Sequence, residues 1–326
     1  MSKNIANNNS TFQLNDEYES KKERNNERKG IIIGILSQFI KALNLIQLKT
    51  FNSFYPNDFS INSLIFWRSL SIWALGYILC LKKGIRIEPL NERRKKFLFI
   101  LRNLLDYIST FLLIKILSYF RSSTSQVASE CNPILVIFLS ILIFNKKFYF
   151  RYIINAFVCI FSFSLILINE NNPDISNIKL NNDKVSGLFF IICYLLVNGF
   201  LCLAQKKLLT EKMSLNELIY YLGMFNTLPA FLICIIQKNF GFGNIRYILY
   251  AISNGIFLFY LSTYLLNKAY EYIPIKKYII IFRMSTMLVF VFGFVFLGEI
   301  IYTTDMIAAG LIILFQLYDF YYPPER

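Results

Sequence analysis

Ten blocks of apolar residues, each close to the length of one membrane-crossing helix, follow one another along the 326-residue chain. A helix needs about 20 predominantly apolar residues to cross the hydrocarbon core of a bilayer. Backbone N–H and C=O groups in lipid must be satisfied internally, which favours helices over open sheets. The pattern therefore predicts an all-α, polytopic membrane protein with ten transmembrane helices. The expected spans are 30–49, 61–81, 97–117, 124–145, 151–169, 187–206, 215–236, 247–267, 277–297 and 303–322.

The basic residues between the apolar blocks are divided unequally between the two sides of the membrane. With a cytoplasmic N-terminus, 23 of the 34 Lys and Arg residues fall on the cytoplasmic side and six on the opposite side. Cytoplasmic loops carry the excess of basic residues, so we expect both termini in the cytoplasm. Residues 1–29 are polar and Asn-rich, which predicts a disordered cytoplasmic tail. The net charge of +14 therefore reflects orientation and does not indicate a nucleic-acid partner.

The chain also contains a weak internal repeat. At a constant offset of 153 residues the spans and the following turn line up, with identical residues at Tyr119/Tyr272, Leu135/Leu288, Val136/Val289, Tyr149/Tyr302, Ile154/Ile307, Ala156/Ala309 and Ile160/Ile313. The Asn-rich segment 170–186 is expected to be a non-cytoplasmic linker between two copies. The sequence thus predicts two five-helix repeats, 30–169 and 187–322. Because five is odd, the second copy inserts inverted relative to the first.

Five basic side chains are embedded in the predicted spans, namely Lys41, Arg68, Arg102, Lys115 and Arg283, and Asp106 and Glu130 are the acidic ones at similar depth. A charge in the hydrocarbon costs about 2.5–3.5 kcal/mol on insertion scales, so such groups should face protein or a water-filled cavity. Lys41 is in the middle of its span and shares one helix face with Gly34, Ser37, Gln38 and Asn44. This polar stripe predicts the wall of a wet cavity. The alternative is a hydrogen-bonded seam between two helices.

Glu130 and Arg283 occupy equivalent positions in the two repeats. Each lies on a polar face of its span, Glu130 with Gln126 and Arg283 with Thr286. Because basic side chains outnumber acidic ones within the spans, the cavity suits an anionic solute, and Arg can bind phosphate or carboxylate in a bidentate manner. We therefore expect Lys41, Glu130, Arg283 and Thr286 to contact the substrate. The alternative is that Glu130 and Arg283 form structural salt bridges with other spans.

Two prolines and a polar segment are further candidates within the spans. Pro133 and Pro229 each free a backbone carbonyl and favour a kink. Tyr221 and Asn226 belong to a polar and aromatic segment that precedes Pro229. We expect Tyr221 and Asn226 to contact the substrate and the two prolines to have structural or gating roles. The alternative for this segment is a kinked helix that only packs.

The remaining embedded charges are expected to have structural or gating roles. Arg102 and Asp106 are four residues apart and share a helix face, which predicts pairing, while Arg102 near the helix end can also reach the interface. Arg68 follows Trp67 and lies somewhat deeper. Both a functional charge and an interfacial anchor of the second span fit its position.

The residues that enzymes and metal sites most often use are scarce in this chain. There is no histidine, and the six cysteines lie inside apolar blocks without paired spacing. The cysteines are typical of small buried hydrophobes and do not indicate a disulfide frame or a zinc site. A lipid-modifying enzyme would need paired carboxylates, a His-based centre or a metal cluster, whereas Asp106 and Glu130 are on separate spans. We therefore expect no catalytic residues, no metal and no cofactor.

Several short elements resemble the drug/metabolite transporter superfamily of the EamA type, over about residues 30–320. The elements are Lys49 at the end of the first span, Phe66-Trp67-Arg68, Arg102, Asn132-Pro133-Ile134 and the turn Leu297-Gly298-Glu299. The equivalent of that turn in the first repeat departs from the pattern and reads Phe144-Asn145-Lys146. The resemblance implies a solute carrier that works by alternating access, with the substrate held centrally between the two halves.

A narrower resemblance, to the nucleotide-sugar and triose-phosphate relatives, comes from Lys206-Lys207 and the segment up to Pro229. The seventh and ninth spans depart from the GDP-sugar pattern, since they read Tyr221-Leu222-Gly223-Met224 and Phe282-Arg283-Met284-Ser285-Thr286. Sequence and resemblance together predict a secondary transporter for a small organic metabolite or drug, with membrane lipid around it. A channel or a scaffold is the alternative. The solute, the driving ion, the membrane (endomembrane, organellar or plasma) and homodimer formation stay open.

Overall fold

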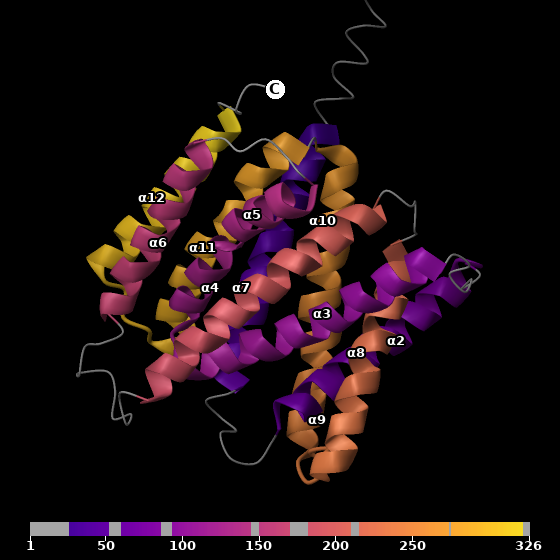
Figure 1. Ribbon diagram of the computed structural model, residues 1–326. Helices are drawn as coiled ribbons and strands as arrows, with labels where there is room; N and C mark the ends of the chain where they lie inside the picture. The colour runs from indigo at the N-terminus through magenta and orange to yellow at the C-terminus, as the bar shows by residue number, and fades with distance from the viewer. Residues whose placement is uncertain are drawn as a thin grey trace, which may run out of the picture.

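The computed structural model describes residues 26–51, 60–85, 93–144, 150–169, 182–209, 215–273 and 275–321. Within these ranges the regular secondary structure is helical and contains no strand. Figure 1 shows the helices stacked side by side in one assembly. The all-α class expected from the sequence is confirmed for the described residues. Residues 1–25 of the expected tail and 170–181 of the expected linker lie outside them.

The helices lie over the apolar blocks of the sequence. They are the N-terminal helix (Asn26–Phe51), α2 (Ile61–Lys82), α3 (Arg93–Tyr119), α4 (Ser122–Glu130), α5 (Asn132–Phe144), α6 (Arg151–Asn169), α7 (Asn182–Leu209), α8 (Leu215–Gln237), α9 (Ile245–Ser253), the π-helix η2 (Asn254–Tyr260), α10 (Leu261–Tyr272), α11 (Ile275–Leu297) and α12 (Thr303–Tyr321).

Six helices among the described residues are long and apolar enough to cross a membrane: Asn26–Phe51, Ile61–Lys82, Phe97–Tyr119, Val185–Ala204, Ile219–Gln237 and Ile245–Ala269. The other predicted spans coincide with the interrupted α4 and α5 and with α6, α11 and α12, whose apolar parts are shorter. The count of ten transmembrane helices therefore stays a prediction.

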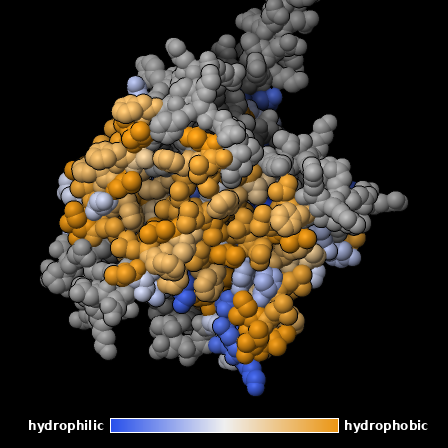
Figure 2. All heavy atoms as spheres, viewed as in Figure 1, coloured by the Kyte–Doolittle hydropathy of each residue, from blue (hydrophilic) through white to orange (hydrophobic). Residues whose placement is uncertain are grey.

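The surface of the protein is that of a membrane protein. Figure 2 shows apolar side chains across most of the coloured face, with hydrophilic groups gathered near its lower edge. Ile236 and Leu142 are 80% and 73% exposed, and many other large apolar side chains share this exposure. Such a continuous apolar surface is unfavourable in water, whereas lipid tails solvate it. The chain is therefore an integral, multi-pass membrane protein.

Two of the expected spans are interrupted. The fourth, expected to run unbroken over 124–145, breaks at Cys131 between α4 and α5. The break comes two residues before Pro133, because proline has no N–H to continue the helical hydrogen bonds. The eighth contains the π-helix η2, which the apolar pattern did not indicate. Pro229, in contrast, lies inside the unbroken helix α8.

Helices that are far apart in the sequence pack in pairs. α2 packs against α8, α3 against α7, α4 against α11, and α6 against α12. Figure 1 shows α6 beside α12 on one flank and α2 beside α8 on the other. Glycines allow α2 and α8 to approach closely: a Cβ added to Gly223 would lie 2.4 Å from the Trp73 nitrogen, and one added to Gly76 would lie 2.8 Å from the Tyr220 Cα.

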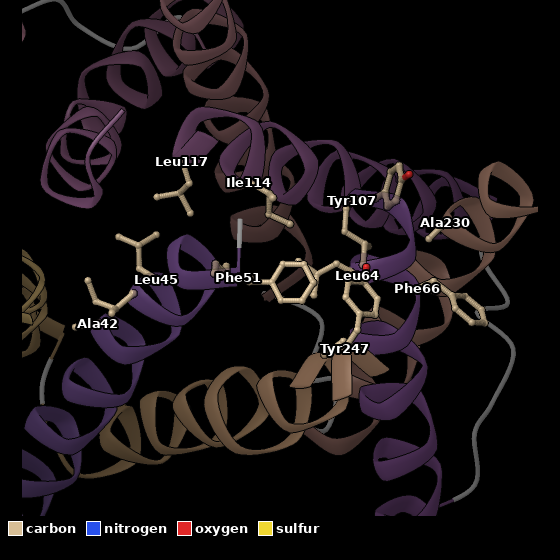
Figure 3. Packing of buried hydrophobic residues seen from close by; sticks show 14 of the residues in the cluster. Ala42, Leu45, Phe51, Leu64, Phe66, Tyr107, Ile114, Leu117, Ala230 and Tyr247 are labelled. Atoms are coloured by element: carbon tan, nitrogen blue, oxygen red, sulfur yellow. The ribbon is translucent and has the colours of Figure 1, made fainter. Parts of the chain in front are cut away.

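The largest buried cluster joins the N-terminal helix to α2, α3, α8, α9 and α11. Figure 3 shows Phe51, Leu64 and Tyr247 from three of these helices pointing toward one another. The rings of Phe51 and Tyr247 have centroids 4.7 Å apart. The Tyr247 hydroxyl hydrogen-bonds the Ser63 hydroxyl, so that the one polar atom of this ring is satisfied within the cluster. The cluster fixes the N-terminal helix against the α2–α8 pair.

The contact between α2 and α8 can be tested with glycine substitutions. We expect Gly223→Leu to destabilise the protein by at least about 1–3 kcal/mol, because the side chain meets the backbone of Trp73. Gly310→Leu in α12 is the matched control, since nothing lies within 4 Å of a Cβ there. Thermal denaturation in detergent would measure the effect. Equal melting temperatures for the two variants would contradict this packing.

Candidate functional site

A cavity of about 690 Å³ lies at the centre of the described helices. Its walls come from the N-terminal helix, α2 to α5, α7, η2, α10 and α11, so both predicted repeats contribute. Polar side chains occur on several walls, among them Lys41, Arg68, Glu130, Asn198 and Thr263. A polar cavity within an apolar bundle is where a membrane protein can hold a water-soluble ligand.

The N-terminal helix contributes the polar stripe that was predicted from the sequence to be a cavity wall. Ser37, Gln38, Lys41 and Asn44 all line the cavity. Gly34, the fifth member of the stripe, packs elsewhere, because a Cβ there would lie 3.2 Å from the Ile281 side chain. The stripe is therefore a cavity wall from Ser37 onward, and the glycine serves helix packing.

A hydrogen-bonded network around Glu130 joins α4 to α11 beside the cavity. Glu130 is 3% exposed. Its Oε1 accepts hydrogen bonds from Gln126 Nε2 at 3.0 Å and from Thr286 Oγ1 at 3.1 Å. Gln126 also lies 3.4 Å from the hydroxyl of Ser285, which lines the cavity. A buried carboxylate needs such donors, since its desolvation costs several kcal/mol otherwise.

Arg68 belongs to α2, in the same predicted repeat as Glu130, and is 5% exposed. Its guanidinium carbon is 4.4 Å from the centre of the Phe259 ring, over which it lies. Both residues line the cavity. The structure thus places Arg68 in a cavity wall, which is not the environment of an interfacial anchor.

Four other residues singled out from the sequence lie at or near the contact between α3 and α8. Asn226 donates to Asp106 Oδ2 at 2.8 Å. The ring of Tyr221 packs edge-on against Phe99, with centroids 5.0 Å apart. Arg102 donates to Asn103 Oδ1 at 2.8 Å, so Arg102 and Asp106 take different partners despite their spacing on one helix face. Tyr221 and Asn226 are not among the residues that line the cavity.

Two further candidates can be placed only by their backbone. Arg283 belongs to α11, two residues before Ser285, and Pro133 is the second residue of α5. Their side chains lie outside the described part of the structure.

At one end of the cavity, Glu299 caps α4 from across the molecule. Glu299 Oε1 and Oε2 accept hydrogen bonds from the backbone N–H and the hydroxyl of Ser122, both at 2.7 Å. Ser122 is the first residue of α4, where backbone N–H groups have no partner inside the helix and a negative charge complements the helix dipole. Gly298, with φ +65°, turns the chain after α11, and Gly293 leaves room for the carboxylate. The turn resembling the family pattern is thus part of a contact between distant helices.

Arg121 and Asp305 form a buried ion pair next to this cap. Their Nη1 and Oδ2 atoms are 2.9 Å apart, and the two side chains are 8% and 0% exposed. Arg121 also donates to the Ile300 carbonyl at 2.8 Å, and Asp305 accepts from the Tyr302 N–H at 3.2 Å. Breaking a buried pair by removing one partner costs about 3–5 kcal/mol. The pair therefore holds the α3–α4 junction firmly to the start of α12.

Lys49 completes this group of contacts. Its Nζ donates to the carbonyl oxygens of Leu117 at 2.5 Å and Phe120 at 2.7 Å, where α3 ends. Carbonyls at a helix end have no partner within the helix, so a lysine stabilises them. We call this group the end cluster and define it as Lys49, Arg121, Ser122, Glu299 and Asp305.

Arg121, Asp305 and Phe259 were not predicted from the sequence as functional residues. A signal existed for Asp305, because an acidic residue in the first turn of a helix complements the helix dipole. Nothing in the sequence pointed to Phe259, because its place in the wall depends on the π-helix η2.

Known proteins share features with this chain. The model of the EamA-like transporter family matches residues 28–168 and 185–317. A Dictyostelium discoideum protein named solute carrier family 35 member B1 is 28% identical over 168 residues, which are 49% of this chain and 41% of that protein. The chain therefore matches less than half of the length of this curated relative.

A crystal structure of another protein has the same fold. It superposes with a TM-score of 0.58 over 88% of this chain and 95% of the other, at 11% sequence identity. At this identity the likeness speaks for the fold alone. The family match covers most of the chain in two segments and agrees with the apolar helices and the central polar cavity. The protein therefore belongs to the EamA-like transporter family.

Proposed function

We propose that this protein carries a small, anionic organic solute by alternating access, through rocking of two inverted five-helix halves about the central cavity. The single observation that carries the proposal is the cavity itself, whose lining has charged residues from the first half and polar residues from both halves. Arginine and lysine in its wall attract an anion, and Glu130 provides a group that can change partners during the cycle.

The internal repeat supports the two-halves part of the proposal. At the offset of 153 residues, the ends of α3 and α10 correspond (Tyr119 and Tyr272), as do the starts of α4 and α11 (Ser122 and Ile275). The ends of α5 and α11 correspond at the same offset. The family model also matches the chain twice, once in each half. Coinciding helix bounds are expected if both halves descend from one unit.

The pairing of helices supports the same relation. In the order of the expected spans, α2 and α8 are the second spans of their halves, α4 and α11 belong to the fourth, and α6 and α12 are the fifth. Each of these packs against its own counterpart. The third span, α3, packs against the sixth, α7, and the eighth is bonded to the first through Asn254, Asn44 and Gln47. A twofold relation between the halves maps the third span onto the eighth and the sixth onto the first, so it converts one of these two contacts into the other.

The end cluster supports a closed state on one side of the membrane. The excess of basic residues on the other side argues for cytoplasmic termini, which puts the end cluster on the non-cytoplasmic face. The cavity lining of α4 begins at Ser125, three residues after Ser122, and runs to Glu130, so the end cluster lies just beyond the cavity on this helix. The cavity is thus separated from the non-cytoplasmic face by buried hydrogen bonds and an ion pair. Alternating access requires these contacts to open.

Counterflow in proteoliposomes tests the function. Vesicles loaded with an unlabelled organic anion should accumulate the same labelled anion, with saturation, because a carrier exchanges its solute across a site exposed to one side at a time. The panel contains carboxylates, phosphate esters and neutral polyols. Flux without counter-stimulation would indicate a channel, and no flux for any solute would contradict a transporter of the proposed class.

The Glu130 network yields a second expectation. Thr286→Val should slow counterflow about five- to hundredfold, because a buried carboxylate that loses a hydrogen-bond donor costs about 1–3 kcal/mol. Thr286→Ser keeps the hydroxyl and is expected to retain most of the rate. If Thr286→Val and Thr286→Ser carry solute equally fast, the hydrogen bond to Glu130 has no part in transport.

Arg283→Ala is expected to lower the apparent affinity for anions in the same counterflow measurement. Normal transport by Arg283→Ala would show that Arg283 does not contact the solute.

The end cluster yields a third expectation, measured without transport. Arg121→Gln should expose the cavity to the non-cytoplasmic side, because the ion pair and the bond to Ile300 are lost. The measurement is labelling of a cysteine placed at Ser129 by a membrane-impermeant thiol reagent, with the native cysteines replaced. The control is Lys238→Gln, which removes an exposed charge from the loop after α8. Equal labelling of the two variants would rule out the end cluster as the closure.

A further inference from the structure

The environment of Arg68 is unusual for a buried charge. The side chain is 5% exposed and lines the cavity. A guanidinium carries five N–H donors, and burial without acceptors is costly. The Arg68 guanidinium lies over the Phe259 ring, 4.4 Å from the ring centre, and an aromatic ring offers no conventional acceptor. Asp106, an acidic side chain whose charge acts on Arg68, takes its hydrogen bond from Asn226.

The position of Phe259 is set by the backbone of the segment to which it belongs and not by the choice of a side-chain rotamer alone. Phe259 belongs to the π-helix η2, and π-helices occur frequently at functional sites. Asn254, at the start of η2, donates to Asn44 and Gln47 of the N-terminal helix, both at 2.9 Å. Gly255 presses against α2 at Arg68 itself, since a Cβ there would lie 2.5 Å from the Arg68 carbonyl oxygen. The hydrogen bonds of Asn254 and the close packing of Gly255 therefore fix η2, and with it the Phe259 ring, next to the Arg68 guanidinium.

A cation held by an aromatic ring keeps its charge and its hydrogen-bonding capacity. The ring contact stabilises the buried cation electrostatically, while the N–H groups that face the cavity stay available to a ligand. The planar fork of arginine matches the two oxygens of a carboxylate or phosphate better than any other side chain. Lys41 lines the same cavity and adds a second positive charge. The arrangement suits an oxyanion that enters with the solute.

We propose that Arg68, supported by Phe259, is the docking residue for the acidic group of the transported solute, an oxyanion of the carboxylate or phosphate class. This assignment rests on the proposed function, because it places a role on one residue of the proposed transport cavity. It distinguishes Arg68 from Glu130 and Thr286, which hydrogen-bond to each other within the protein. It also gives the π-helix a purpose, namely to fix an aromatic surface under one arginine.

Three variants test the assignment in the full-length protein. Arg68→Gln removes the charge and should weaken the apparent affinity for the oxyanion about ten- to hundredfold. Arg68→Lys keeps the charge without the fork and should raise KM more than it lowers the maximal rate. Phe259→Leu removes the ring and should weaken binding in the same direction. The matched controls are Arg246→Gln and Phe257→Leu, since Arg246 is an exposed arginine in α9, and Phe257 is 65% exposed on η2.

The readouts are counterflow and ligand-induced thermal stabilisation in detergent, each with succinate, glycerol 3-phosphate and sorbitol. The wild-type protein should be stabilised by one or both anions and not by sorbitol, and the comparison between the anions tells carboxylate from phosphate. Arg68→Gln should lose this stabilisation, while Arg246→Gln keeps it. If Arg68→Gln fails to fold, the KM of Arg68→Lys tests the docking role: a raised KM supports it, and an unchanged KM contradicts it.

The two proposals fail in different ways. One outcome would overturn the docking role alone. In it, the wild type shows anion-stimulated counterflow, and Arg68→Gln or Arg68→Lys has the same KM and the same anion-induced stabilisation as the wild type. Counterflow of sorbitol in preference to both anions would overturn the anionic substrate class and the docking role together. Absence of counterflow, with anion stabilisation that Arg68→Gln abolishes, would contradict the carrier and support the binding site.

Discussion

A charged side chain has no favourable place in hydrocarbon, and this constraint organises the protein. Arg68 and Glu130 are each at most 5% exposed, and Asp305 is fully buried. Each is compensated inside the bundle: Arg68 by an aromatic ring, Glu130 by hydroxyl and amide donors, and Asp305 by Arg121. Lipid-facing positions carry large apolar side chains instead. The polar interior and the apolar exterior are therefore two results of the same solvation cost.

Backbone irregularities allow the helices to present polar groups to the interior. The break at Cys131 separates the polar helix α4 from the apolar α5. The π-helix η2 brings Phe259 under Arg68. Irregular backbone at membrane depth is tolerated only where protein or a water-filled cavity surrounds it, and both irregular stretches adjoin cavity-lining residues. Regular helices form the scaffold, and their interruptions form the site.

Helix α4 is capped by the end cluster at its first residue and lines the cavity from Ser125 to Glu130, and this links binding to closure. The first residue of α4 is capped by Glu299 from the α11–α12 turn, and its last residue is Glu130 beside the cavity. α11 contributes Thr286 to the network at the far end of α4. A displacement of α4 relative to α11 therefore changes both the cap and the network. Packed helices with two alternative arrangements are the usual means by which a site and a closure are coupled.

The sequence alone determined what depends on local physics. Apolar length and periodicity placed the helices, and the position of Lys41 on a polar face indicated the cavity wall that the structure contains. The tertiary structure alone decided what depends on packing between distant segments. Sequence spacing suggested that Arg102 and Asp106 pair. In the structure Arg102 hydrogen-bonds Asn103 instead, and Asp106 accepts a hydrogen bond from Asn226. Such contacts depend on which helices face each other, and an apolar pattern records only that a helix crosses the membrane, because lipid and neighbouring helices are equally apolar solvents for its side chains.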